Sequence, residues 1–595
     1  MTTTRKRKVK FDFTPSEYQQ KFFDWVENGV GNAVLEAYAG AGKTATLVYA
    51  MKLIPKDQKC LFIAFNKSIA DELNEKIKSL PNANARTMHS LGYAMIRRNL
   101  GNKIEIDEYK YRNYIKKHIS ELTTTEGEIR TQNQIDEYID SIIMLTNYSR
   151  FNLAQTENEI NDIATKYDIP VSFDECLVTK KCLEWGKEHY ETIDYTDMIW
   201  LCIELSLKPI GLQFDWVFLD EAQDTSLMSI QMFLKCINRG GRFVATGDRK
   251  QAIYMFAGSS NDAFDFMVNY PNTMLFKLPI TYRCGRKIVD LANMFVDNMI
   301  PKDDAVEGEI LEDVKLSEIK NGDMVLSRTK APLVKLYSKL LKKGINCYIK
   351  GQDIGRKLID ILNSTEEKKL NPTLLNKGVF VELYDKMFTE RNKLMEKRGL
   401  DFDDATLSTQ IMEKYDDINT LLTLSDKCKS KTDLINKIDK IFQEESDGIC
   451  LSTIHKAKGL ESDNVYIICR SAMPSKLAKH KWEKEQELNL MYVAYTRAKN
   501  KLAFVSEKEI KPTVSLQEPI AIINELIDTE QIVCKVLGKE PMQRLQNVDL
   551  AKFKLQNITK IDEDFDVAKI DKEIKPQPNV ENEKLLSELD KLLTN

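Results

Sequence analysis

One stretch near the start of this chain constrains its fold more than any other. The apolar, β-prone run Ala33-Val34-Leu35 leads into Glu36-Ala37-Tyr38-Ala39-Gly40-Ala41-Gly42-Lys43-Thr44, and a helical pattern follows over residues 45–51. Small residues in the loop let successive backbone N–H groups close around phosphate oxygens, and the N-terminus of the following helix adds positive potential. The succession of strand, loop, Gly-Lys-Thr and helix therefore predicts a P-loop inside an α/β fold.

The predicted P-loop supplies a cradle and two reactive side chains. Lys43 can reach the β- and γ-phosphates of ATP and the Thr44 hydroxyl can ligate Mg²⁺, so ATP and Mg²⁺ are the expected cofactors. Ala37 departs from the usual pattern, because it stands where the first glycine normally lies. Taken alone, the motif leaves open a simple small-residue turn between a strand and a helix. The cradle is predicted at Ala37, Tyr38, Ala39, Gly40, Ala41 and Gly42.

Two further strand ends carry polar side chains suited to nucleotide hydrolysis. The run Phe214–Leu219 predicts a buried strand that ends in Asp220 and Glu221. Beside a P-loop, Asp220 would hold Mg²⁺, and Glu221 would orient and deprotonate the attacking water. A second predicted strand, Phe243–Thr246, leads to Gln251, whose side chain is placed to sense the γ-phosphate. The alternative is an acidic strand-to-helix turn without a catalytic role.

Other candidate binding residues rest on weaker patterns. Gln19, just ahead of the P-loop strand, could pair its amide with the adenine edge, although a surface glutamine on a helix would look the same. Tyr254 and Phe256 lie two apart, so in extended backbone both rings face one side and can stack on successive bases of a single strand. Core packing is the alternative for these aromatics, and a hydrogen-bonded structural role is the alternative for a lone histidine. The candidates at the ends of two further strands are Phe65, Asn66 and His89.

Composition narrows the class of protein. A length of 595 residues predicts about three to five domain-sized units. With 86 Lys and Arg against 90 Asp and Glu, a surface for nucleic acid has to be a local groove. Eleven cysteines without a Cys-x-x-Cys pair argue against a zinc ribbon or a disulfide framework. No apolar run approaches the roughly 20 residues of a membrane span, so we expect no binding to membranes. The scattered cysteines fit a reducing compartment, and we expect an intracellular protein, either cytoplasmic or, in a eukaryotic host, nuclear. We also expect a monomer.

Seven motifs occur in a fixed order along the chain. They are Ala37–Thr44, Phe65–Ala70, Asp220–Asp224, Gly247–Gly258, Thr281–Arg283, Ser452–Glu461 and Tyr492–Ala498. In this order they resemble the motifs of a UvrD/Rep-type superfamily 1 DNA helicase. Within that group, their residues are most similar to those of the F-box DNA helicase branch. The resemblance covers the motor only, and no F-box-like segment is expected before it.

The resemblance implies an α/β fold of two RecA-like P-loop lobes with parallel sheets, each interrupted by a helical insertion. Both expected insertions are charged and poor in motifs, and the second is shorter than its counterpart in the larger helicases of the group. The expected boundaries are residues 1–10 for a basic tail, 11–105 and 195–277 for the first lobe, 106–194 for its insertion, 278–351 and 448–510 for the second lobe, 352–447 for its insertion, and 511–595 for a C-terminal extension.

The resemblance also assigns nucleotide contacts to the second lobe. Tyr282 would stack on adenine, and Arg283 would reach the γ-phosphate. Arg497 lies in a segment that leads to a predicted strand ending in Leu502–Val505, and it would be the arginine finger on the transferring phosphoryl group. Glu461 would hold the ribose hydroxyl.

DNA contacts follow from the same resemblance, which places Thr453 and His455 against DNA phosphates. Three positions depart from the family's pattern. Ala45 and Ala257 stand where relatives often have a basic residue, and Phe256 stands where many relatives have tryptophan. These departures concern the details of the adenine and DNA contacts rather than ATP hydrolysis.

Together these residues predict an ATP-dependent DNA helicase or translocase that moves 3′ to 5′ on single-stranded DNA and acts at junctions with duplex, in replication, repair or recombination. A translocase that strips proteins with little unwinding is an alternative, as is a nucleic-acid-binding scaffold without a working motor. At the C-terminus, a linker-like Lys575–Pro578 precedes leucines at helical spacing, which predict an amphipathic helix that packs on the motor or docks a protein partner. These leucines are Leu585, Leu586, Leu589, Leu592 and Leu593.

Overall fold

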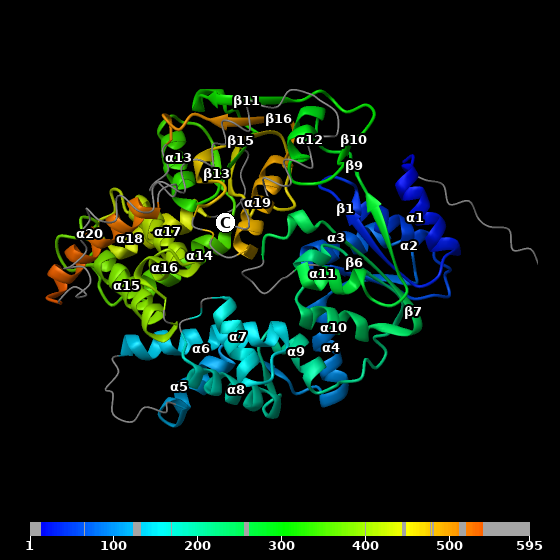
Figure 1. The fold of residues 1–595 in the computed structure, drawn as a ribbon, viewed down its shortest axis with the longest axis horizontal. Coiled ribbons are helices and arrows are strands. Elements are labelled where there is room, and N and C mark those ends of the chain that lie inside the picture. The colour runs from blue at the N-terminus through cyan, green and yellow to red at the C-terminus, as the bar shows by residue number, and fades with distance from the viewer. Residues whose placement is uncertain are drawn as a thin grey trace, which may run out of the picture.

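Two α/β lobes, each built on a six-stranded parallel sheet, make up the core of the protein (Figure 1). This computed structural model describes residues 13–64, 66–122, 132–167, 169, 171–254, 261–398, 400–442, 448–476, 478, 481–510 and 519–539. The predicted fold class of two α/β lobes with parallel sheets is confirmed. The basic tail at residues 1–10 and the leucine-rich segment after Lys575–Pro578 lie outside the described residues.

The sheet of the first lobe is buried on both faces. Its strand order is β3-β2-β6-β7-β1-β8, with every neighbouring pair parallel. Alternate residues of a strand point to opposite faces, so Ala33 and Leu35 of β1 join one apolar cluster and Val34 joins the other. The strands are β1 (Asn32–Ala37), β2 (Cys60–Ala64), β3 (Ala83–Thr87), β6 (Phe214–Leu219), β7 (Ile237–Gly247) and β8 (Thr273–Leu278).

Helices cover both faces of this sheet. One face carries α1 (Glu17–Asn28), α2 (Lys43–Leu53) and α3 (Lys67–Ile77). The other face carries α4 (Met88–Leu100), α9 (Asp197–Glu204), α10 (Leu227–Lys235) and α11 (Asn261–Val268). Short 3₁₀ turns follow two strands, η1 (Ala222–Asp224) after β6 and η2 (Arg249–Gln251) after β7.

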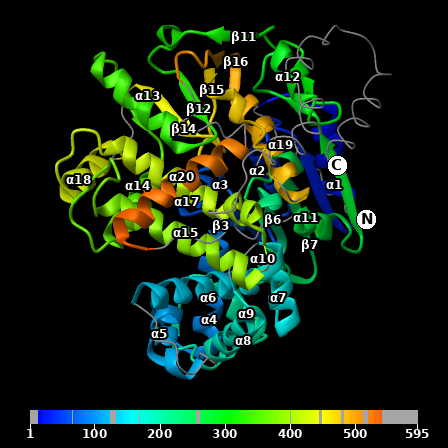
Figure 2. The ribbon, with the colours of Figure 1, turned by 60° about the vertical axis from the view of Figure 1, so that its left-hand side comes forward.

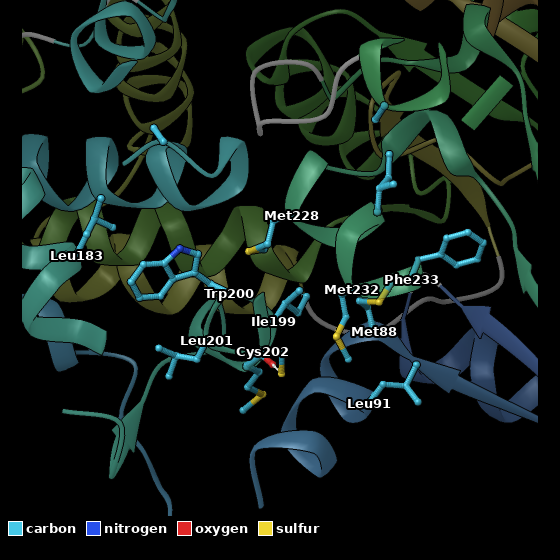
Figure 3. Close-up of a cluster of buried hydrophobic side chains, with 14 of the residues drawn as sticks. Met88, Leu91, Leu183, Ile199, Trp200, Leu201, Cys202, Met228, Met232 and Phe233 are labelled. Carbon is cyan, nitrogen blue, oxygen red and sulfur yellow. Dashed lines mark hydrogen bonds between the residues drawn. The ribbon is translucent and has the colours of Figure 1, made fainter. Parts of the chain in front are cut away.

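A helical region interrupts the first lobe between β4 (Glu105–Ile106) and β5 (Thr192–Ile193), two short strands that pair with each other. Figure 3 shows how its core merges with that of the lobe, because Leu183 of α8 shares a cluster with Trp200 of α9 and with Met88. The two parts therefore form one packed body. The helices of this region are α5 (Lys110–Leu122), α6 (Gln132–Asn152), α7 (Glu157–Lys166) and α8 (Phe173–Glu188).

Buried charges fix the same junction. Asp197, at the start of α9, is fully buried and contacts Lys110 and Arg150 at 2.7 Å each. The Tyr111 hydroxyl also donates to Asp197 at 2.8 Å. A buried carboxylate is tolerated only when it is paired and hydrogen-bonded, so this set of contacts locks α9 onto α5 and α6.

The sheet of the second lobe has the order β11-β16-β15-β12-β14-β13, again with parallel neighbours. A separate short pair, β9 (Ile280–Thr281) with β10 (Ile300–Pro301), opens the lobe. The strands of the sheet are β11 (Glu309–Val314), β12 (Met324–Ser327), β13 (Cys347–Ile349), β14 (Ile449–Thr453), β15 (Ser462–Ile467) and β16 (Ala498–Val505). The helices of this lobe are α12 (Arg286–Ala292), α13 (Lys330–Lys342) and α19 (Lys481–Tyr495), with 3₁₀ turns at η4 (Leu316–Glu318) and η5 (Arg470–Ala472).

A second helical region separates β13 from β14, and a further helix, α20 (Pro519–Leu537), lies across it (Figure 2). The buried face of α20 includes Ile522, Leu526 and Val533, which belong to the same apolar cluster as the second lobe. Among the described residues, none of the helices has the length and apolar character needed to cross a membrane. The region consists of α14 (Gln352–Asn363), α15 (Val379–Arg398), α16 (Phe402–Thr406), α17 (Thr409–Leu424) and α18 (Lys431–Ile441).

Candidate active site

The predicted P-loop joins β1 to α2 and lies against the second lobe. Ala37 is the last residue of β1, and Lys43 is the first of α2. Gly40 and Gly42 have φ values of 72° and 74°, a conformation that glycine adopts without strain. A Cβ on Gly40 would also lie 2.6 Å from Cβ of Arg283, so the loop has room only for glycine there. Residues of both lobes therefore meet at the end of β1 that carries the P-loop.

The two reactive P-loop side chains contact the two carboxylates at the end of β6. The Thr44 hydroxyl donates to Oδ2 of Asp220 at 2.7 Å, and Nζ of Lys43 lies 3.2 Å from Oε1 of Glu221. Glu221 has a φ of 51°, a left-handed conformation that costs energy for a residue other than glycine. The structure thus brings together Lys43, Thr44, Asp220 and Glu221, as the motifs predict.

The charges of this group depend on each other. Burial would lower the pKa of Lys43, but the negative charges of Glu221, Asp220 and Asp248 outweigh it and raise that pKa. Burial and the charge of Glu221 raise the pKa of Asp220. Burial pushes the pKa of Glu221 upward too, but Lys43 and Lys458 outweigh it and lower that pKa. Glu221 is therefore ionised, and Lys43 is its counter-ion.

Thr44 and Asp220 fit the predicted Mg²⁺ site. Both present hard oxygen atoms, and Mg²⁺ in such sites takes few protein ligands besides water and substrate phosphates. In the described part of the chain, no cluster of three or more His, Cys, Asp or Glu side chains could hold a metal by itself. A hydroxyl beside one carboxylate is the donor set expected for Mg²⁺ that arrives with a nucleotide.

Behind these residues, a row of hydrogen bonds links the ends of β6 and β7. The amide of Gln223 donates to Glu221 at 2.6 Å, and its oxygen accepts from the backbone N–H of Asp248 at 3.0 Å. The carboxylate of Asp248 accepts from Nε2 of Gln251 at 2.7 Å. Burial raises the pKa of Asp248. Gln251 is thus held in place through Asp248 and is linked through Gln223 to Glu221.

Arg497 joins this hydrogen-bond network. It belongs to the second lobe, where it follows α19 and precedes β16. It is 1% exposed, and its Nη2 lies 3.4 Å from Oε1 of Gln251. Its other donors reach the backbone oxygens of Val493 and Leu460. Burial and the neighbouring charge of Arg283 lower the pKa of Arg497 to about 10, which leaves the guanidinium charged at neutral pH.

Arg283 and Glu461 also contact each other. Nε of Arg283 lies 2.7 Å from Oε2 of Glu461, and its Nη1 donates to the backbone oxygen of Thr496. Lys499 pairs with the other oxygen of Glu461 at 2.8 Å. Both predicted nucleotide residues are therefore engaged with protein partners and would have to exchange them for ATP.

Gln19 and Tyr282 meet at the far end of the P-loop. The Tyr282 hydroxyl donates to Oε1 of Gln19 at 3.3 Å, while Nε2 of Gln19 donates to Thr46 at 2.9 Å. Gln19 is buried and Tyr282 is 42% exposed. Both side chains lie beside the P-loop, because a Cβ on Gly42 would lie 3.9 Å from Nε2 of Gln19 and 3.9 Å from Cδ2 of Tyr282.

The predicted DNA contacts are spread along the ends of several strands. The side chain of Asn66 caps α3 by accepting from the backbone N–H of Ile69, and His89 is exposed at the start of α4. Thr453 ends β14, and the hydroxyl of Tyr254 donates to the backbone oxygen of His455 at 3.0 Å. The structure therefore brings Tyr254 and His455 together from opposite lobes, while Phe65 and Phe256 lie outside the described residues.

Burial and the nearby cations Arg328, Lys330, Lys456 and Lys458 lower the pKa of His455 well below its usual value. The imidazole is therefore neutral at pH 7. It can exchange hydrogen bonds with a phosphate but adds no charge to the contact.

Three further contacts at this site could not be predicted from the sequence, because they join distant segments. Gln223 bridges Glu221 to Asp248, and Tyr492 bridges the P-loop to Asp248. Lys458 forms an ion pair with Asp224 across the lobes. All three lie inside the quoted motifs, which was the available signal, but nothing local to those motifs identifies their partners.

The comparisons with known proteins match both lobes. The family described as UvrD/REP helicase N-terminal domain matches residues 19–269, and the UvrD-like helicase C-terminal domain matches residues 380–509. The F-box DNA helicase protein 1 of Schizosaccharomyces pombe is 24% identical over 79% of this chain and 55% of its own length. The ATP-dependent DNA helicase PcrA of Bacillus subtilis is 22% identical over 80% of this chain and 81% of its own length. The F-box DNA helicase 1 of Gallus gallus is 25% identical over 78% of this chain and 46% of its own length, so the chain spans about half of each F-box relative.

Proposed function

Because this chain belongs to the UvrD/REP-type helicase family, we propose that it hydrolyses ATP at the seam between its lobes and uses that cycle to move along single-stranded DNA. The ATP site would take the adenine against Tyr282, the ribose at Glu461 and the phosphates in the loop from Ala37 to Thr44. The two lobes would then share the nucleotide, so that hydrolysis depends on their closure.

One observation carries the proposal, namely the buried charge of Arg497. Among the described residues its guanidinium contacts only neutral oxygens, namely the side-chain oxygens of Gln251 and Thr496 and the backbone oxygens of Val493 and Leu460. A buried cation without a counter-ion is costly, and an anionic phosphate in the seam would relieve that cost. The neighbouring Lys43 supplies the other side of the same anion site, from the opposite lobe.

The contact of Lys43 with Glu221 suggests how phosphate binding prepares catalysis. Lys43 cannot stay on Glu221 and also bind the β- and γ-phosphates, so the phosphates would take the lysine and release the carboxylate. Glu221 would then be free to orient water and accept its proton. Mg²⁺ held at Thr44 and Asp220 would neutralise developing charge on the phosphate oxygens. Arg497 and Arg283 would stabilise the same charge from the second lobe.

Relative motion of the two lobes would be transmitted to bound DNA through contacts at the same interface between the lobes. Lys458 of the second lobe pairs with Asp224 and donates to the backbone oxygen of Gln251 at 2.6 Å. Its ammonium also lies 5.2 Å from the ring centre of Tyr254, a candidate base-stacking residue. A shift of α19 and the turn after β14 would therefore move the side chains that face ATP and those that face a base together.

The test of the motor is ATP turnover with single-stranded DNA, duplex DNA and RNA as activators. We expect the largest stimulation with single-stranded DNA, and Lys43→Ala should abolish it. Lys52→Ala, at the other end of the same helix, is the matched control and should retain turnover. ATP turnover that persists in Lys43→Ala would show that the P-loop is not the site of ATP hydrolysis.

The direction of movement and its result, either duplex unwinding or protein removal, need separate assays. Movement 3′ to 5′ should displace streptavidin faster from a 5′-biotinylated oligonucleotide than from a 3′-biotinylated one. The second helical region is short, running from Gln352 to Ile441, and a translocase that strips proteins with little unwinding is therefore the second candidate function. A forked duplex beside a protein-blocked single strand distinguishes the candidates, because a stripping motor clears the block and leaves the duplex paired.

A further inference from the structure

The P-loop is packed into the second lobe as well as the first. Ala39 is 1% exposed and belongs to the apolar cluster of the second lobe, and the Tyr38 ring packs against that cluster. These two residues lie in the loop that would cradle phosphate. The backbone that binds the nucleotide is therefore held partly by the lobe that closes over it.

Two tyrosines cross this seam in opposite directions. The hydroxyl of Tyr38, in the P-loop, donates to the backbone oxygen of Asp297, which follows α12 in the second lobe. The hydroxyl of Tyr492, on α19 of the second lobe, accepts from the backbone N–H of Ala39 at 3.0 Å. We call Tyr38 and Tyr492 the seam tyrosines.

The second hydrogen bond of Tyr492 determines that its hydroxyl donates to Asp248 and accepts from Ala39. A hydroxyl has one proton to donate, and that of Tyr492 goes to Oδ2 of Asp248 at 3.0 Å. The same oxygen of Asp248 accepts from Gln251 at 2.7 Å. Tyr492 is fully buried, so its hydroxyl is an inner link between the P-loop backbone and the group that holds Gln251.

Arg497 lies on the same segment as Tyr492 and contacts Gln251. Docking of α19 therefore does two things at once. It delivers Arg497 to Gln251, and it places the Tyr492 hydroxyl between Ala39 and Asp248. A displacement of about 1 Å in such an arrangement is enough to lower a reaction rate severely.

We propose that the seam tyrosines are positioning residues that give the P-loop its hydrolysing shape only when α19 has docked. This inference rests on the proposed ATPase but goes beyond it, because it assigns a task to two hydroxyls that need not touch the nucleotide. Closure would then be sensed by the backbone N–H of Ala39 as well as by the arginines.

The test replaces each seam tyrosine by phenylalanine, which keeps the ring and removes the hydroxyl. The matched control is Tyr466→Phe, a buried tyrosine of the second lobe whose hydroxyl donates to the backbone oxygen of Glu318 at 3.1 Å within that lobe. Tyr492→Phe should lower DNA-stimulated kcat at least tenfold and change KM for ATP less than threefold. Tyr38→Phe should lower kcat about threefold to tenfold, and Tyr466→Phe should leave it within twofold.

Melting temperatures separate positioning from folding. Tyr492→Phe and Tyr466→Phe each lose one buried hydroxyl, so similar melting temperatures with different kcat values support the inference. Equal kcat values in these two variants would overturn it. A rise in KM with unchanged kcat for Tyr492→Phe would also overturn it, because that result assigns the hydroxyl to ground-state binding of ATP.

A second measurement needs no turnover. In a peptide covering residues 36–43, the amide of Ala39 should exchange at least tenfold faster in Tyr492→Phe than in the wild type, because it loses its acceptor. Tyr466→Phe should exchange at the wild-type rate. Unchanged hydrogen exchange in Tyr492→Phe refutes the inference even if the protein proves to have no ATPase activity. Absence of DNA-stimulated ATP turnover in the wild type refutes only the proposed function.

Discussion

The ion pair between Arg391 of α15 and Glu530 of α20 allows the docking of α20 to be tested quantitatively. Both side chains are almost fully buried, at 1% and 4% exposure, and the guanidinium donates to the two carboxylate oxygens at 2.8 Å each. Glu530→Gln keeps the shape and leaves the guanidinium without its counter-ion. Breaking a buried pair in this way costs about 3–5 kcal/mol.

That cost is large compared with the rest of the contact. The buried apolar stripe of α20 includes Ile522, Leu526 and Val533, each worth about 1.5–3 kcal/mol when buried. Losing the pair therefore removes a contribution comparable with half of the apolar term. With a factor of ten for every 1.4 kcal/mol, opening of α20 should become about a hundredfold to several thousandfold more frequent.

Hydrogen exchange of residues 519–537 measures this opening directly. The control is Lys539→Met, which removes an ion pair with Asp385 at the end of the same helix. The Lys539 and Asp385 side chains are 53% and 29% exposed, so that pair is worth about 0–1 kcal/mol. Exchange in Glu530→Gln that matches the control would refute the reasoning. Recovery in the double variant Arg391→Met with Glu530→Leu would support it, because apolar side chains of similar volume can replace a buried pair.

Three further predictions concern the ATP site. Arg497→Lys should lower DNA-stimulated kcat about a thousandfold or more, because an arginine finger contributes on that scale; a loss below tenfold in a steady-state assay would contradict its role. Chelation of Mg²⁺ with EDTA should abolish turnover and added Mg²⁺ should restore it, and turnover that persists in EDTA would remove Thr44 and Asp220 from the proposed site. Since burial raises the pKa of Asp248, kcat should fall as the pH drops through that raised value and stay level above it, because protonated Asp248 no longer accepts from both Gln251 and Tyr492; a pH profile flat down to the usual aspartate range would contradict this.

Some of the fold is encoded locally enough to be predicted from the sequence. The predicted strand Phe214–Leu219 coincides with β6, and the Gly-Lys-Thr of the P-loop falls at the start of α2 as predicted. Parallel strands buried on both faces appear as short apolar runs that end in polar turns, so their ends are visible in the sequence. The polar residues at those ends could therefore be assigned to one edge of a sheet.

The residue pairs that form contacts between the two lobes could not be predicted in the same way. Tyr492 and Asp248 are 244 positions apart, and Lys458 and Asp224 are 234 apart. A local pattern states that a residue ends a strand but does not identify its partner in another lobe. The segment before Arg497 shows the same limit, because it leads to a strand as expected but is itself the end of the long helix α19.

The distribution of apolar contacts indicates where the molecule can open. Each helical region shares an apolar core with its own lobe, whereas the first lobe contributes only Ala39 and Ile253 to the buried, described residues of the cluster at the seam. The remaining seam contacts are mostly polar, including those of Arg497 and an ion pair between Lys397 of α15 and Glu175 of α8. Polar contacts contribute about 0.5–1.5 kcal/mol each, far less than a shared core. The lobes should therefore part at the seam with each helical region moving as part of its lobe, and release of Lys397 from Glu175 should accompany every opening.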